Sequence, residues 1–318
     1  RYAPGPEIWN MAQDKHDRAE LESIIARTAL KYDLLPYESN PFPQSHPHRM
    51  GAMAKLFGLE PVPLGRARVL ELGCAAGGNL IPHAFRNPGA TFVGVDLSRT
   101  QVAAGRARIA HLGLENVKIH CRSLTELDEA VGQFDYIICH GVYSWVPAPV
   151  REEILRISQE RLAPDGVAYI SYNVLPGWRM LQALRDAFLL EIPDQNDSRR
   201  RVAQARQFLA FLKDTVPAGS AYQKIIAGEE LRFAGMSDDY IAHEFLEEIN
   251  EPCTFKEFLE QAGRRGLAYL GDADLPSMIL DNQPAETARR VRERVGNNLA
   301  ATEQCLDYIT GRTFRQTL

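Results

Sequence analysis

The sequence predicts an α/β fold with a doubly wound parallel sheet, and two observations support this prediction. Short apolar runs alternate with helical patterns between residues 68 and 173, as βαβ units require. A loop of small residues, GCAAGG at 73–78, follows the first run, and Asp96 ends the second run 23 residues after Gly73. Glycines in such a turn let the backbone approach a ligand, and an acid about 20 residues further on can bind ribose hydroxyls. We therefore expect a Rossmann-like sheet with a nucleotide-type site at this turn.

The N-terminal region, residues 1–66, is predicted to contain a helix and an ordered flap. Apolar residues recur at helical spacing between residues 14 and 32. The span 32–47 holds four prolines, which exclude a continuous helix. The same span carries three aromatic residues that a solvated linker rarely has: Tyr32, Tyr37 and Phe42. We interpret this span as a folded flap, which a short helix follows at 50–59.

Residues 67–180 are predicted to form the sheet domain. Strands are expected at 69–72, 91–95, 117–121, 134–140 and 167–173, with helices at 99–112 and 150–162. Ser98 and Gln101 match a capping box at the start of the helix 99–112, and Gly113 matches a left-handed cap at its end. Because parallel strands place their carboxyl ends at one edge, the segments that follow them are expected to surround one crevice.

Residues 181–318 are predicted to be mainly helical. Helical patterns begin just before this boundary and occupy 180–190, 198–212, 221–230, 237–249, 254–264, 284–295 and 298–310. Thr254 and Glu257 match a second capping box. Two short apolar runs lie near 266–271 and 313–318, and we expect both to be strands that complete the sheet after a helical insertion.

Composition narrows the functional classes. The net charge of −5 and the pI near 6.0 argue against a mainly electrostatic nucleic-acid binder. No run approaches the ~20 apolar residues of a membrane span. Five cysteines without a C-x-x-C pair provide neither a disulfide framework nor a zinc site, and no other metal-ligand cluster is present, so no bound metal is expected. With no secretory leader pattern, the simplest expected localisation is the reducing cytoplasm.

The residues around the glycine turn resemble those of class I S-adenosylmethionine-dependent methyltransferases. The turn reads E-L-G-C-A-A-G, where dinucleotide enzymes more often show G-x-G-x-x-G, and the acid of V-D-L-S stands at a strand end before a capped helix. The resemblance implies S-adenosylmethionine as the cofactor. The expected cofactor-binding residues are Glu71, Gly73, Cys74, Ala75, Gly77, Asn79, Asp96, Leu97, Ser123, Leu124, His140 and Gly141.

Four longer segments narrow this resemblance: YDLLPYESNPFPQSHP, SYNVLPGW, AHEFLEEINEPCTFKEFLEQAGRRGLAYLGDA and TFRQTL. They are similar to segments of bacterial methyltransferases that carry a methyltransferase regulatory domain, of which the rickettsial-type protein lysine methyltransferases are the best characterised. The resemblance implies a cofactor-binding domain, a helical substrate or regulatory region and a protein or peptide substrate. It also implies a homodimer, and a further domain after TFRQTL.

The candidate residues for the methyl acceptor's side of the crevice are aromatic or amide side chains. Methyl transfer depends on the alignment of acceptor, methyl group and sulfur, and a cationic sulfonium favours nearby aromatic faces. The candidates after the strands and in the flap are Tyr143, Trp145, Tyr172, Asn173 and Tyr37. Tyr143 and Trp145 could equally fill the core, whereas the polar pair Tyr172 and Asn173 favours the site.

Other polar groups have simpler explanations. His46 and His140 are more often structural than catalytic, and Asp33 fits a turn cap better than a cofactor contact. The acidic residues between 238 and 251 fit a solvated helix face better than a site for a basic peptide. No acid is placed at the acceptor side, which favours desolvation and orientation of the acceptor over a dedicated base.

Together these observations predict methyl transfer to an amine, in the first place a protein lysine. The G-V-Y-S that follows the fourth strand differs from the N/D-P-P-Y type of motif, which speaks against enzymes that methylate DNA bases or glutamine. Two alternatives remain open. One is a small-molecule N- or O-methyltransferase of secondary metabolism, and the other is a non-catalytic cofactor-binding protein that regulates through its helical half.

Overall fold

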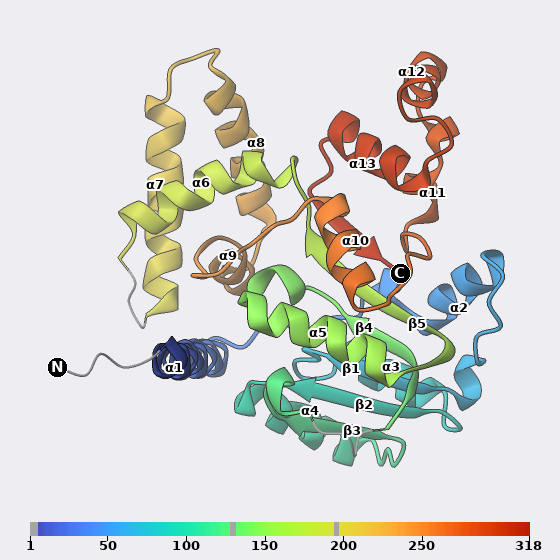
Figure 1. Ribbon diagram of the computed structural model, residues 1–318. Helices are drawn as coiled ribbons and strands as arrows, with labels where there is room; N and C mark the ends of the chain where they lie inside the picture. Colours follow the sequence, from blue (N-terminus) through green and yellow to red (C-terminus); the bar gives the residue numbers. More distant parts are fainter. Residues whose placement is uncertain (1–5, 128–131, 194–196) are drawn as a thin grey trace.

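The computed structural model describes residues 6–127, 132–193 and 197–318. Figure 1 shows a sheet with flanking helices at lower right, a group of helices from α6 to α9 at upper left, and α1 beside both. In the described part of the chain, no helix combines the length and the apolar character that crossing a membrane requires.

The sheet has six strands in the order β3-β2-β1-β4-β5-β6. Their bounds are β1 (Arg68–Leu72), β2 (Thr91–Asp96), β3 (Val117–Cys121), β4 (Phe134–Cys139), β5 (Leu162–Asn173) and β6 (Phe314–Thr317). The first five strands are parallel to one another, and β6 pairs antiparallel with β5. The central strands are buried on both faces, which explains why they read as continuous apolar runs.

Thirteen helices are assigned among the described residues. Those that precede or flank the sheet are α1 (Pro6–Leu34), α2 (Pro47–Leu56), α3 (Leu80–Arg86), α4 (Arg99–His111) and α5 (Ala148–Arg161). Those that follow β5 are α6 (Trp178–Glu191), α7 (Ser198–Thr215), α8 (Ala221–Gly235), α9 (Asp238–Phe245), α10 (Phe255–Arg264), α11 (Leu275–Met278), α12 (Ala285–Val295) and α13 (Leu299–Thr310).

The molecule has separate hydrophobic cores for the two sheet faces and for the helical group. Successive residues of β4 serve different cores: Ile137 packs in the cluster with α5 and α10, and Ile138 packs in the cluster with α2 and α3. This alternation is the period of two that a strand imposes. A third cluster joins α6, α7, α8 and α9 and includes Leu35 at the start of the flap, so the flap is tied to the helical group.

The expected doubly wound sheet is confirmed, including the last strand at 313–318. The capping box of Thr254 and Glu257 is present, and Gly113 has the left-handed φ of +63° after α4. The capping box at Ser98 is only half formed. The Ser98 side chain accepts from the Gln101 amide, but the Gln101 side chain turns to the flap instead of returning to Ser98.

The prediction of a strand near 266–271 is wrong. This segment lies beside β6 and exchanges hydrogen bonds with it, from the Leu270 amide to the Leu318 carbonyl (2.9 Å) and from the Leu318 amide to the Gly271 carbonyl (2.7 Å). The pairing stops at a single bridge between Asp272 and Thr317, because the chain turns there toward α11 as the Asp274 amide donates to Asp272. The segment is therefore too briefly paired to form a strand.

Candidate active site

A cavity of about 530 Å³ lies beyond the carboxyl ends of the parallel strands. Doubly wound sheets bind ligands at this position, and the volume is within the roughly 300–1,000 Å³ of small-molecule sites. The walls come from the glycine turn, from the flap after α1, from the segments that follow β2, β3, β4 and β5, and from α8 and α9. The sheet domain and the helical group therefore enclose one space together.

The glycine turn forms one end of this cavity. The Gly73 and Cys74 amides both donate to the Val95 carbonyl, at 2.8 and 3.1 Å. Gly73 has φ +73°, and a side chain there would lie 2.4 Å from a methyl carbon of Val142. A residue other than glycine would therefore push the turn away from the segment after β4.

Nearly all of the expected cofactor-binding residues line the cavity: Glu71, Gly73, Cys74, Ala75, Asn79, Asp96, Leu97, Ser123, Leu124, His140 and Gly141. Gly77, the remaining expected residue, is not among the lining residues. Gly77 has φ +72°, and a side chain there would lie 2.8 Å from Ile119 in the packed layer behind the turn. Gly77 therefore shapes the turn and does not face the cavity.

Asp96 shares its carboxylate between the protein and the cavity. One oxygen accepts from the Ala75 amide at 2.7 Å, and the other accepts from the Ser98 amide at 2.9 Å. Burial raises the pKa of Asp96, and these amide bonds oppose the shift. Because a carboxylate offers about four lone-pair sites, both oxygens can still accept from hydroxyl groups of a ligand.

Glu71 is a buried carboxyl group with one unused oxygen. Its Oε1 accepts from the Asn79 side chain at 2.9 Å, whereas its Oε2 has no partner within the described residues. Burial raises the pKa of Glu71 to about 8, the Asn79 bond opposes this shift, and the charge of Asp96 adds to it. A cationic group of a ligand would satisfy the free oxygen and favour the ionised form.

The flap is fastened to the glycine turn and to the start of α4. The Gly78 amide donates to the Ser39 hydroxyl at 2.7 Å, and a side chain at Gly78 would meet the Ser39 carbonyl oxygen at 1.9 Å. The Phe42 amide donates to Asn79 at 3.0 Å, and the Gln101 side chain donates to the Tyr37 carbonyl at 2.6 Å. Sequence reasoning assigned none of these contacts, since they join segments far apart in the chain.

Asp33 and His140 have structural partners. Asp33 accepts from the Ser98 hydroxyl at 2.6 Å and from the Thr100 amide at 3.0 Å, so it caps the distant helix α4 and not a local turn. His140 bonds to the Tyr169 hydroxyl at 2.8 Å and stacks on Phe42 at 3.7 Å. Burial lowers the pKa of His140 to about 4, which leaves the ring neutral at physiological pH. Within the described ranges, no three His, Cys, Asp or Glu side chains are grouped as metal ligands.

Comparison with known proteins assigns a family to this geometry. The predicted methyltransferase regulatory domain matches residues 237–318, and the methyltransferase domain matches residues 70–168. The uncharacterized protein RP028 of Rickettsia prowazekii (strain Madrid E) is 37% identical over 242 residues, which are 76% of this chain and 97% of that relative. The chain belongs to the methyltransferases that carry a methyltransferase regulatory domain.

Two longer relatives match most of this chain. The uncharacterized protein RP789 of the same strain is 39% identical over 317 residues, which cover 97% of this chain and 57% of that protein. The structure of PKMT2 from Rickettsia typhi in complex with AdoHcy is 37% identical, has a TM-score of 0.79 and covers 89% of this chain and 54% of PKMT2. This chain therefore spans just over half the length of these two relatives.

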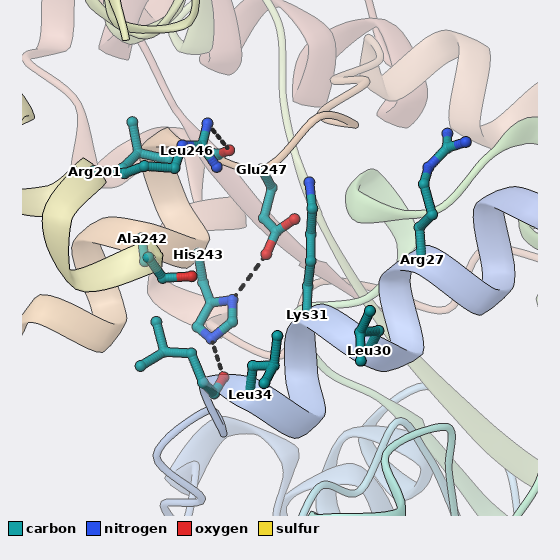
Figure 2. Close-up of a pocket in the computed structure, with 11 residues that line it drawn as sticks. Arg27, Leu30, Lys31, Leu34, Arg201, Ala242, His243, Leu246 and Glu247 are labelled. Carbon is teal, nitrogen blue, oxygen red and sulfur yellow. Dashed lines mark hydrogen bonds and ion pairs between the residues drawn. The ribbon is translucent and has the colours of Figure 1, made fainter. Parts of the chain in front are cut away.

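The regulatory domain of this methyltransferase contributes directly to the cavity. Tyr240, His243 and Glu244 come from α9, and Thr313 and Phe314 come from the start of β6. Figure 2 shows how α9 is joined to α1, with His243 between Glu247 and the end of α1. The His243 ring bonds to Glu247 and to the Leu35 carbonyl, each at 3.0 Å.

Three of the residues expected on the acceptor side line the cavity. Trp145 packs edge-on against Trp178 with ring centroids 6.4 Å apart, and the buried side-chain nitrogen of Asn173 has no partner among the described residues. Tyr37 reaches the cavity from the flap, and burial, followed by the charge of Glu244, raises its pKa. The Asn173 side-chain nitrogen and the aromatic faces of Trp145 and Tyr37 are therefore available to a second ligand.

The expectation that Tyr143 and Tyr172 line the crevice is wrong. Both rings are fully buried in the core between the sheet and α10, where Tyr172 stacks on Phe258 at 4.2 Å. The Tyr143 hydroxyl donates to Gln261, and the Tyr172 hydroxyl bonds to Thr317 at 3.2 Å. Because side chains alternate along a strand, Tyr172 points into the core while its neighbour Asn173 faces the cavity.

Sequence reasoning also missed residues that the structure brings to the cavity. The missed polar and aromatic residues include Tyr32, Ser39, Phe42, Gln101, Arg232, Tyr240, His243, Glu244 and Phe314, whereas Arg122 and Trp178 belong to segments that the sequence placed around the crevice. The flap aromatics were a usable signal, because a surface linker seldom carries them. Glu244 had no such signal, since it belongs to an acidic helix that reads as solvated.

Proposed function

We propose that this protein transfers a methyl group from S-adenosylmethionine to an amine, and that the amine is the side chain of a protein lysine. The observation that carries the proposal is one continuous cavity that joins Asp96 of the methyltransferase domain to Trp145 and Asn173. A cofactor and an acceptor can meet in this space while the flap and the helical group shield them from water. The similarity to PKMT2, one structure of which contains AdoHcy, supports this assignment.

The residues of the glycine-turn end fit the cofactor. Asp96 offers acceptor positions for ribose hydroxyls, Leu97 and Leu124 offer apolar surface for a base, and the unpartnered oxygen of Glu71 suits an ammonium group. When bound, the cofactor supplies a methyl group on a sulfonium: the amine lone pair forms the new C–N bond while the S–C bond breaks and leaves its electrons on sulfur.

The acceptor end suits an amine that must be desolvated. A free lysine has a pKa of ~10.4 and is protonated at neutral pH, so its side chain must lose a proton before it can attack. Tyr37 and Trp145 supply aromatic walls that exclude water and attract a cation, and Asn173 supplies an amide that can orient the nitrogen. The resemblance to rickettsial-type protein lysine methyltransferases supports lysine over a small metabolite.

We further propose that the protein is a cytoplasmic homodimer. All five cysteines are free thiols, which agrees with a reducing compartment. Large apolar side chains remain exposed on the helical group, including Leu190 at 89% and Leu231 at 79%. Exposed apolar surface of this kind is typical of subunit contacts.

The direct test is methyl transfer in a bacterial lysate. The protein is incubated with cofactor labelled in the methyl group, the labelled products are separated by size, and modified proteins are analysed by mass spectrometry. We expect label on lysine side chains of protein. Label found only on small molecules, or on carboxylates, would contradict the lysine assignment but keep the methyltransferase. No label at all, together with no binding of AdoHcy in a calorimetric titration, would contradict both.

A further inference from the structure

Glu244 places a carboxylate at the acceptor end of the cavity. It belongs to α9, the first helix of the regulatory domain, and it lines the same cavity as Asp96, Trp145 and Asn173. Its side chain is partly exposed to that cavity. Among the described residues, no hydrogen bond or close ion pair engages its carboxylate, so the group is available to a ligand.

The neighbouring cations have hydrogen-bond partners other than Glu244. Arg232 of α8 also lines the cavity, but its guanidinium pairs with Glu229 at 3.0 Å. Arg185 of α6 donates to the Glu247 carbonyl. Burial raises the pKa of Glu244 to about 7, Arg232 and Arg185 oppose this shift, and Glu229 adds to it. Glu244 is therefore close to its midpoint of ionisation at neutral pH, where it can exchange a proton.

Aromatic residues surround this carboxylate on the cavity side. Tyr240 lies one helical turn before Glu244, and Tyr37 approaches from the flap. The negative charge of Glu244 is, after burial, the next cause that raises the pKa of each of these two phenols, and all three residues line the same cavity. Tyr32 adds a further ring, stacked on His243 at 4.8 Å. One carboxylate among aromatic faces is a composition that binds alkylammonium groups.

We propose that Glu244 is the substrate-binding carboxylate of this methyltransferase, which pairs with the ammonium group of the target lysine and accepts its proton. This inference rests on the function proposed above. In the proton step an N–H bond of the ammonium breaks, its electron pair stays on nitrogen as the nucleophile, and a new O–H bond forms on Glu244. The proton then passes to water at the cavity mouth, which restores the carboxylate. The regulatory domain thereby supplies the group that recognises a cationic acceptor.

The test measures binding of n-butylammonium, a mimic of the lysine side chain, to the protein saturated with AdoHcy. Trp145 and Trp178 line the cavity, so tryptophan fluorescence can report the titration. We expect the affinity of the wild type to rise about tenfold between about pH 6 and about pH 8, because a group with a pKa near 7 goes from mostly protonated to mostly ionised over this range. The probe itself stays charged throughout.

The variant is Glu244→Gln, and its matched control is Asp239→Asn, which removes a charge from a half-buried position of the same helix that does not line the cavity. We expect Glu244→Gln to bind n-butylammonium about tenfold more weakly at about pH 8 and to lose the pH dependence, and Asp239→Asn to behave as the wild type. Glu71 also titrates in this range, but it lies at the cofactor end and is unchanged in both variants.

Two results would overturn the proposal. One is an affinity of the wild type for n-butylammonium that does not change with pH, a result that does not depend on whether a variant folds. The other is equal affinities in the wild type and Glu244→Gln. A parallel titration with AdoHcy separates this proposal from the function itself. If Glu244→Gln binds AdoHcy normally and loses only n-butylammonium, the proposal is supported. If the wild type fails to bind AdoHcy, the proposed function is contradicted instead.

Discussion

Three acids of the cavity differ in how many hydrogen bonds their carboxylate oxygens accept from the protein itself. Both oxygens of Asp96 accept backbone amides, one oxygen of Glu71 accepts Asn79, and Glu244 carries no hydrogen bond from the described residues. The more a carboxylate is held by the protein, the more rigidly it is placed for a neutral hydroxyl. The less it is held, the better it can take up a cation or a proton. This order agrees with the proposed ligands of the three acids: ribose hydroxyls at Asp96, the amino group of the cofactor at Glu71 and the substrate lysine at Glu244.

For Asp96, we predict that Asp96→Asn lowers the affinity for AdoHcy by about tenfold or more. The change removes the charge that strengthens hydrogen bonds from ribose hydroxyls, which are worth ~1.5–3 kcal/mol each when charged. Calorimetric titration measures the effect. The control is Asp165→Asn, an exposed residue of β5 with φ +58°, which asparagine tolerates. Equal affinities for the wild type and Asp96→Asn would contradict the assignment of Asp96 to the ribose.

Glu71 makes stability depend on pH. Its pKa in the folded protein is about 8, above the ordinary value of 4.5, so the folded state holds a proton that the unfolded state has lost between these values. The free energy of unfolding should therefore fall as pH rises from about 4.5 to about 8 and then level off. We predict that Glu71→Gln shows a smaller fall in urea unfolding across this range. An identical slope in both proteins would show that Glu71 is not protonated in the fold.

The buried tyrosines should affect stability and not chemistry. We predict that Tyr143→Phe and Tyr172→Phe each lower the free energy of unfolding by ~1 kcal/mol, the net value of one hydrogen bond, to Gln261 and Thr317 respectively. Methyl transfer should stay within about twofold of the wild type, because neither ring faces the cavity. Urea unfolding and initial rates measure the two effects. A large loss of turnover in a variant of unchanged stability would show that the hydroxyl takes part in the reaction.

The elements of the sheet were predictable because their signals are local. The run from Val69 to Leu72, the glycines after it and Asp96 at the next strand end occur within one βαβ unit, and they located the cofactor end of the cavity. The acceptor end was not predictable in the same way. Whether Tyr172 or Asn173 faces the cavity depends on which sheet face α10 covers, and Glu244 reaches the cavity only because α9 packs against a flap some 200 residues earlier.

The last strand is held by a buried ionic cluster. Arg315 of β6 is fully buried and bonds to Asp307 (2.9 Å) and Glu303 (3.0 Å), lies 3.4 Å from Asp272, and packs over the ring of Phe255 at 4.0 Å. These partners come from α13, from the segment beside β6 and from α10. The cluster therefore joins α10, α13 and the segment beside β6 to the edge strand of the sheet.

Removal of the central cation of this cluster should be strongly destabilising. We predict that Arg315→Ala lowers the free energy of unfolding by ~3–5 kcal/mol, because three buried carboxylates are then left to share Arg312, which lies 3.3–4.0 Å from them. The control Arg294→Ala changes an exposed arginine of α12 and should stay within about 0.5 kcal/mol. Urea unfolding compares the two variants. A loss below about 1 kcal/mol for Arg315→Ala would contradict the prediction and would mean that the acids do not need a second cation beside Arg312.

At the scale of the whole molecule, the apolar residues on the surface indicate where a second copy could bind. The apolar residues Leu184 and Phe188 of α6 are covered by α7, α8 and α9. What remains for a subunit contact is the exposed set that includes Leu190 and Leu231. The structural support for a dimer therefore rests on these exposed apolar residues.

We predict that sedimentation of the wild type shows a species about twice 35.6 kDa at micromolar concentration, because exposed apolar residues of this size favour burial in a second copy. Leu190→Lys should shift the protein toward the monomer, since it places a charge in that contact. The control is Leu299→Lys, at an exposed position of α13 away from the helical group. A wild type that sediments only at 35.6 kDa would contradict the dimer.

The flap is clamped from both sides. The Tyr37 carbonyl accepts from Gln101 of the methyltransferase domain, and two residues earlier the Leu35 carbonyl accepts a contact from His243 of the regulatory domain. If exchange of the cofactor requires the flap to move, one of these two hydrogen bonds must break, and cofactor binding is then coupled to the position of α9. A partner that binds one arrangement of α9 more tightly would then change the affinity for the cofactor. The cofactor would change the affinity for that partner by the same factor, because linkage is reciprocal. The short stretch from Leu35 to Tyr37 is thus where the timing of turnover can be set.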